Sequence, residues 1–201
     1  MKVLLLAAFP VLLFSCDTAI QSHKNDSAQG NDPAHDTAVQ VLINSGQYSE
    51  DNSAADPENK TGEKLMQTET VGKLHLGLDS KSTFSEMGIP DFKSAVRKWE
   101  ADGLFHQDWT YDSGIDLNMA GEDSLKMEIF SLRCFTPCSL KTSRNIGIGS
   151  SFEEVKDAYR DVLAEKQDEE QALVAGSIYG GIIFSFENGK LSSVFIGAAA
   201  E

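Results

Sequence analysis

The chain has 201 residues, with 31 acidic against 17 basic side chains and a formal net charge of −14 at pH 7. Nucleic acids and anionic lipid headgroups reward clustered lysine and arginine, so this charge balance argues against both as ligands. An acidic surface is instead typical of a well-solvated protein. We therefore expect no nucleic-acid partner.

The first residues have the composition of an export signal. Lys2 supplies a basic start, residues 3–14 are apolar, and the small Ser15 precedes Cys16. The apolar run is too short to span a bilayer as a helix, which takes about 20 residues. It fits the apolar region of a secretory signal, so we predict a signal peptide over residues 1–15.

The Ser15-Cys16 junction resembles the lipobox of bacterial lipoproteins, in which the cysteine becomes the acylated first residue of the mature chain. The resemblance implies lipidation of Cys16 by several acyl chains, which makes membrane attachment stable. It also implies a lipid-anchored protein of the bacterial cell envelope, at the outer rather than the inner membrane. An ordinary signal peptide with an incidental thiol is the alternative.

The segment after Cys16 is acidic and poor in large apolar side chains. Residues 17–70 contain one Tyr and no Trp or Phe. Such a composition cannot bury enough apolar surface to offset chain entropy, so we predict that residues 16–70 form the lipidated cysteine and a disordered acidic tether. The apolar patch 38–43 is either an element that docks on the globular domain, a partner-binding element or a transient local structure.

Residues 71–201 are long enough for one domain with its own core. Two segments look alike, because Thr83 with Glu86 and Ser151 with Glu154 each have the spacing of a capping box. Matches later in the chain repeat at nearly the same offset. We therefore predict a duplication with half-repeats at 71–135 and 144–197, each a helix followed by three antiparallel strands.

Several local patterns place the elements. In the second half, helical spacing after Ser151 is shown by Phe152, Val155 and Tyr159. In the first half, the helix ends at Gly88-Ile89-Pro90, because proline cannot continue a helix. A second helix is predicted after it, over residues 91–99. Alternating apolar residues predict strands, and Asn188-Gly189 predicts a hairpin turn. The predicted fold class is α+β: two tandem helix-plus-three-strand repeats that form an antiparallel sheet covered on one face by helices.

The segment 145–155, with Tyr159 after it, resembles the Gly-x-Ser-x-x-x-Val helix start of small bacterial lipoproteins. The SmpA/OmlA subunit of the outer-membrane barrel-assembly machinery is one example, and two such units in tandem resemble the beta-lactamase inhibitor protein fold. The resemblance implies a protein that binds other proteins and is not an enzyme. No binding residue of these families maps onto a position in this chain.

Three cysteines occur, and lipidation of Cys16 leaves the pair Cys134 and Cys138. Disulfides persist outside the cytosol, so we predict a local bridge between them. Free thiols are one alternative. Redox activity is another, although it usually calls for Cys-x-x-Cys at the start of a helix.

Four neighbouring residues, Trp99, Phe105, His106 and Trp109, form the candidate binding surface, since exposed aromatic side chains mark interaction sites. The alternative is that they form the core of the first half. His106 has the carboxylates of Asp102 and Asp108 close in sequence, which could orient a general base. Because no further catalytic or metal-ligating residues join them, we predict no catalytic residue, no metal and no cofactor.

These patterns lead to one functional hypothesis and one alternative. We expect a lipid-anchored envelope lipoprotein that acts as a non-catalytic protein-binding or scaffolding module, with the membrane and an envelope protein as partners. The alternative is an envelope binder or carrier of a small ligand or peptide, which would lie in a groove between the half-repeats.

Overall fold

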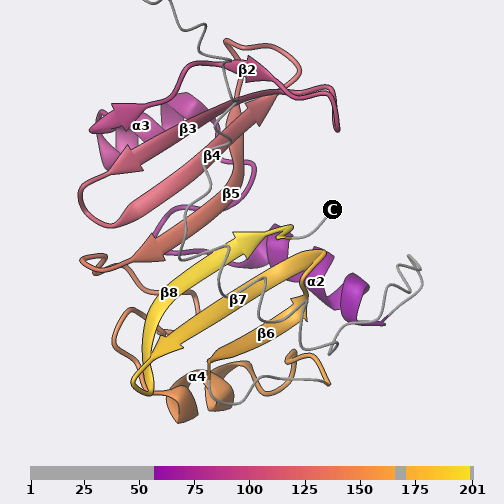
Figure 1. The fold of residues 1–201 in the computed structure, drawn as a ribbon, viewed down its shortest axis with the longest axis vertical. Helices are drawn as coiled ribbons and strands as arrows, with labels where there is room; N and C mark the ends of the chain where they lie inside the picture. Colours follow the sequence, from indigo (N-terminus) through magenta and orange to yellow (C-terminus); the bar gives the residue numbers. More distant parts are fainter. Residues whose placement is uncertain (1–56, 166–170, 200–201) are drawn as a thin grey trace, which may run out of the picture. The chain divides into compact units, whose positions relative to one another are not determined.

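The computed structural model of the chain describes residues 57–165 and 171–199 (Figure 1). The predicted signal peptide, Cys16, the apolar patch 38–43 and most of the predicted tether lie outside these residues. Within them, no helix is both long enough and apolar enough to cross a bilayer.

One antiparallel sheet of eight strands organises the described chain. Its strand order is β1-β3-β4-β5-β8-β7-β6, with β2 also paired to β3. The strands are β1 Phe92–Lys93, β2 Arg97–Lys98, β3 Phe105–Tyr111, β4 Ile115–Gly121, β5 Glu128–Phe135, β6 Ala172–Ser177, β7 Gly180–Glu187 and β8 Lys190–Gly197.

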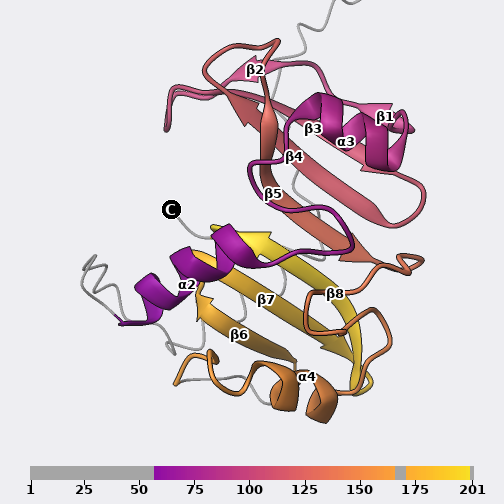
Figure 2. The same cartoon turned by 180° about the vertical axis from the view of Figure 1, so that it is seen from behind.

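The helices gather on one face of this sheet. They are α2 Pro57–Thr68, α3 Ser80–Met87 and α4 Phe152–Tyr159. Helices α2 and α3 lie in front of the sheet in Figure 2 and behind it in Figure 1. Alternate strand residues, such as Leu117 and Phe184, meet Val155 and Tyr159 in the main core between the layers.

The predicted α+β class is wrong, because the described chain is mainly β, with 41% strand and 19% helix in a single eight-stranded sheet. It does not consist of two helix-plus-three-strand repeats. The helix predicted over 91–99 is replaced by β1 and β2, whose backbones pair with β3 through Phe92 opposite Thr110 and Arg97 opposite His106. The apolar spacing suited a helix, but the open edge of β3 offered hydrogen-bond partners that a short isolated helix lacks.

One of the two predicted capping boxes is confirmed. The Ser151 hydroxyl accepts a hydrogen bond from the Glu154 N–H, and the Glu154 carboxylate accepts one from the Ser151 N–H. Helix α3 is capped differently: the Asp79 carboxylate accepts two N–H groups of the first turn, each at 2.9 Å. Thr83 lies inside that helix and Glu86 pairs with Lys73, so the predicted Thr83–Glu86 box is wrong.

Helix α2 lies in a region predicted to be disordered. It packs on β6 and β7 through Gly62, where an added Cβ would come 1.8 Å from the Gly180 carbonyl oxygen. Only a glycine allows the two backbones to approach this closely. The polar composition of α2 suggested disorder, but tertiary packing stabilises a helix that is weak in isolation.

A buried carboxylate fixes the chain directly after α2. Glu69 is 3% exposed. Its Oε1 accepts the Ser143 N–H at 2.8 Å, and its Oε2 accepts the Tyr159 hydroxyl at 3.2 Å. The end of α2 is thereby bound to both the 142–143 loop and α4.

The hairpin predicted at Asn188-Gly189 is confirmed. Both residues have positive φ, of 52° and 70°, and they join β7 to β8. Strand β8 also pairs with β5, through Leu132–Phe135 opposite Ser193–Ile196. The last described strand therefore connects the meander β3-β4-β5 to the meander β6-β7-β8.

Candidate functional site

The four residues of the candidate binding surface lie on two faces of the sheet. Side chains alternate along β3, so Phe105 and Trp109 point towards the helices while His106 points to the opposite face. Trp109 is 3% exposed, and its ring packs 4.6 Å from that of Phe84, with the Lys93 Nζ 3.8 Å from its centroid. The four residues therefore do not form one surface. Trp109 belongs to the core, which was the alternative interpretation.

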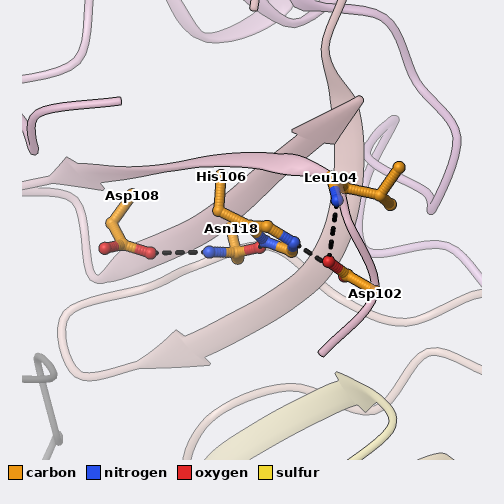
Figure 3. Close-up of polar contacts among 5 residues, drawn as sticks. All are labelled: Asp102, Leu104, His106, Asp108 and Asn118. Atoms are coloured by element: carbon orange, nitrogen blue, oxygen red, sulfur yellow. Dashed lines mark hydrogen bonds and ion pairs between the residues drawn. The ribbon is translucent and has the colours of Figure 1, made fainter. Parts of the chain in front are cut away.

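On the opposite face, His106 is the centre of a hydrogen-bonded chain of side chains (Figure 3). Its Nε2 lies 2.8 Å from Asp102 Oδ2, and its Nδ1 lies 2.7 Å from Asn118 Oδ1. The Asn118 Nδ2 donates in turn to Asp108 Oδ1 at 2.7 Å. Strands β3 and β4 position this chain, because their register places Asp108 directly opposite Asn118.

The network fixes the orientation of its members. Asn118 donates its amide to a carboxylate, so its oxygen must face the His106 ring. Both ring nitrogens of His106 therefore face acceptor oxygens. Both ring nitrogens are therefore engaged by neighbouring side chains, which fixes the plane of the imidazole.

Asp102 belongs to the turn that leads into β3. Its Oδ1 accepts the Leu104 N–H at 2.9 Å, which fixes the carboxylate beside the histidine. This hydrogen bond is the main cause that holds the pKa of Asp102 below its ordinary value, and the bond from His106 acts in the same sense against partial desolvation.

Two aromatic rings enclose His106. The Trp99 indole is stacked on the imidazole, with ring centroids 3.8 Å apart and planes 9° apart. The Phe130 ring meets the imidazole edge to face at 5.3 Å. His106 is only 2% exposed as a result, whereas Trp99 and Phe130 remain 37% and 41% exposed. The polar network thus supports a half-exposed aromatic surface, which we call the Trp99–Phe130 surface.

This geometry fits binding better than acid–base catalysis. A general base needs a nitrogen within hydrogen-bond reach of a substrate proton, and both nitrogens of His106 are held by neighbouring side chains. In the described ranges, 57–165 and 171–199, no three His, Cys, Asp or Glu side chains are grouped so that they could hold a metal ion. The arrangement can instead hold an aromatic side chain in a fixed orientation at the surface.

Exposed apolar side chains are concentrated in the same half of the sheet. Across the part of the chain that the structure describes, the exposed large hydrophobic residues all lie between positions 84 and 130. They are Phe84, Ile89, Phe92, Val96, Trp99, Leu125 and Phe130. Within the described residues, the β1–β5 half therefore carries the exposed apolar area.

Cys134 and Cys138 lie together, as their spacing predicted. Cys134 is near the end of β5, and both residues are buried as free thiols joined by a hydrogen bond between their side chains. That bond, aided by the Leu140 N–H, lowers the pKa of Cys138 to about 7. The same contact, together with burial, raises the pKa of Cys134. The disulfide stays a prediction.

Sequence reasoning found part of this site. It noticed the carboxylates of Asp102 and Asp108 near His106 but missed Asn118 and Phe130. A hairpin that pairs Tyr111 with Ile115 would have placed Asn118 opposite Asp108. Phe130 had no comparable signal, because an irregularity in the β4–β5 pairing after Asn118 shifts the register just where Phe130 lies.

Comparisons with known proteins add no relative: no family model matches the chain, and neither the curated proteins nor the solved structures contain a match.

Proposed function

We propose that this protein is a lipid-anchored component of the bacterial cell envelope and that it binds a protein partner without catalysing a reaction. The partner would dock on the Trp99–Phe130 surface. The observation that carries the proposal is the stack of a half-exposed Trp99 on a fully buried, doubly hydrogen-bonded His106. Tryptophan held in one orientation is typical of the residues that dominate the binding energy of protein interfaces.

The energetics of the network support this assignment. Hydrogen bonds of this kind contribute only modest net stability, because folding exchanges them for hydrogen bonds to water. A network of this kind can instead fix the orientation of the Trp99 ring before a partner arrives. Preorganisation of that kind lowers the entropy that binding costs.

The anchor rests on the sequence around Cys16. The lipobox resemblance supplies the acyl chains, and the acidic segment that precedes α2 is the proposed connection to the globular region. Replacement of Cys16 by Ala tests this part. The wild-type protein should sediment with membranes and resist a high-salt wash, whereas the variant should be recovered in the soluble envelope fraction. A variant that remains in the membrane pellet would show that the anchor is wrongly assigned.

Site-specific photo-crosslinking tests the binding surface in membranes that contain the full-length protein. A benzophenone side chain at position 130 should join the protein to one defined partner. The same group at position 84 is the matched control, because Phe84 is 36% exposed but lies on α3, on the opposite face. We expect an adduct from position 130 only, and we expect Trp99→Ala to abolish it. Equal adducts from both positions, or none, would refute the docking surface.

A further inference from the structure

We infer that the partner presents a basic side chain, arginine or lysine, to the Trp99–Phe130 surface. This inference rests on the proposed function, which it deepens by naming the chemistry of the docked segment. Three observations support it: the local charge, the unused capacity of Asp108 and the half-exposed indole.

The charged residues at this end of the sheet are predominantly acidic. The start of β3 pairs with the end of β4, so the 97–104 segment and the 122–128 turn lie at the same end as Trp99. Five exposed carboxylates occur there, Glu100, Asp102, Glu122, Asp123 and Glu128, against three exposed cations, Arg97, Lys98 and Lys126. The excess of negative charge attracts a basic segment and disfavours an acidic one.

Two carboxylates belong to the hydrogen-bonded chain around His106, and they differ in what they can still accept. Both oxygens of Asp102 are engaged, by the Leu104 N–H and by His106. Asp108 is exposed, and its Oδ1 takes the Asn118 amide. Asp108 lies two residues after His106, on the same face of β3. Its second oxygen points away from the hydrogen-bonded chain (Figure 3). It is available to a donor from outside.

An arginine suits the combination of a half-exposed indole and an exposed carboxylate on the same face of the sheet. A guanidinium can lie flat on an indole while its N–H groups donate to a carboxylate, and tryptophan is the best aromatic partner for a cation. The exposed part of Trp99 supplies the aromatic surface, and Asp108 supplies the acceptor. A neutral glycan or an apolar peptide would gain nothing from the acidic surroundings.

Peptide titration of the full-length, 15N-Trp-labelled protein in detergent micelles tests the inference. The chain has two tryptophans, so each indole gives its own signal. The probe is acetyl-(Gly-Arg)3-amide, with (Gly-Gln)3 and (Gly-Glu)3 as matched peptides. The arginine peptide should shift the Trp99 indole signal and leave that of the buried Trp109 in place. A shift of both signals or of neither, or an equal response to the glutamine peptide, would overturn the inference.

Three variants make the test specific. Asp108→Asn and Trp99→Leu should each weaken binding of the arginine peptide at least fivefold. Glu187→Gln removes an exposed carboxylate from the far β7–β8 hairpin and controls for loss of bulk charge, so it should leave binding unchanged. Equal weakening by Glu187→Gln would mean non-specific attraction to an acidic protein and would refute the inference. Because Trp99→Leu leaves the network of Asp108 intact, the two site variants are independent.

The crosslinked partner separates this inference from the proposed function. A peptide joined to position 130 that carries arginine or lysine next to the attachment point supports both. A neutral or acidic peptide at that position would refute the inference but would remain consistent with the proposed function. The absence of any adduct would refute the function itself.

Discussion

The imidazole of His106 lies nearly parallel to the indole of Trp99, with only 3.8 Å between the ring centroids, and both of its nitrogens are hydrogen bonded to neighbouring side chains. The orientation of a surface tryptophan is thus tied to a buried polar network. The stability of that network can be measured apart from any partner.

His106→Ala should destabilise the protein more than Trp99→Ala. Loss of the imidazole leaves Asp102 and Asn118 without their hydrogen-bond partner, which we expect to lower the free energy of unfolding by about 2 kcal/mol. Trp99 is partly exposed, so its truncation should cost about 1 kcal/mol. Urea denaturation followed by far-ultraviolet circular dichroism measures both. A His106→Ala variant as stable as the wild type would mean that the network does not hold Trp99 in place.

The Asp102 carboxylate should make stability depend on pH in the acidic range. Its folded-state pKa is lowered, chiefly by the Leu104 N–H. Its contribution is therefore fully present above the unfolded value of about 4, and it is lost as the pH falls from there through the folded value. Asp102→Asn should flatten the stability profile below about pH 4 relative to wild type. The profile is obtained from thermal melts at stepped pH, and an unchanged slope would contradict the assignment.

Oxidation of the Cys134–Cys138 pair should form the predicted bridge without moving the strands. The sulfur atoms are already hydrogen bonded, and closure of so short a loop should add about 2 kcal/mol to the free energy of unfolding. Alkylation under denaturing conditions, with and without reductant, followed by mass spectrometry, detects it. Full labelling of both thiols without reductant would exclude the bridge in the isolated protein. In a separate alkylation of the folded, reduced protein, Cys138 should react before Cys134, because its pKa is lowered to about 7.

Two substitutions distinguish the observed cap of α3 from the one expected from sequence. Asp79→Ala removes the carboxylate that accepts two N–H groups and should be the more destabilising of the two. Glu86→Gln should cost less than about 0.5 kcal/mol, since it removes only a partly exposed pair with Lys73. Guanidinium melts of both variants settle the order. The reverse order would restore the Thr83–Glu86 capping box.

Gly62→Ala should detach α2 from the sheet. The new methyl group would collide with the backbone of Gly180, which has no flexible side chain to move aside. Lys64→Ala on an exposed position of the same helix is the control and should be neutral. Amide hydrogen exchange should show loss of protection in α2 for the glycine variant only. Equal protection in both variants would mean that the close approach is not needed.

The parts of the fold that local chemistry specifies were predictable from the sequence. Ser151 with Glu154 marked a helix start, and Asn188-Gly189 marked a hairpin, because both depend on residues a few positions apart. The fold class was predicted wrongly, because the secondary structure of some segments depends on contacts with residues far away in the sequence. Residues 92–98 have apolar spacing that suits a helix, yet they pair with β3, and α2 is stabilised by contact with strands more than a hundred residues away.

The candidate site likewise contains residues that the sequence identified and residues that it did not. His106 and its neighbouring acids could be selected from sequence because they are close along the chain. The choice of Trp109 as a surface residue failed, since alternation along β3 puts it on the face opposite to His106. Phe130 depends on the irregular register between β4 and β5, which no local signal marks.

The central position of β8 has a consequence for biogenesis. β8 is made after every other described strand, yet it lies between β5 and β7 and is the only link between the two meanders. During synthesis, an emerging chain can therefore form two separate hairpin groups but cannot close the sheet until residues 190–197 have left the ribosome. Until then the facing edges of β5 and β7 stay open, and each could pair with another strand in place of β8.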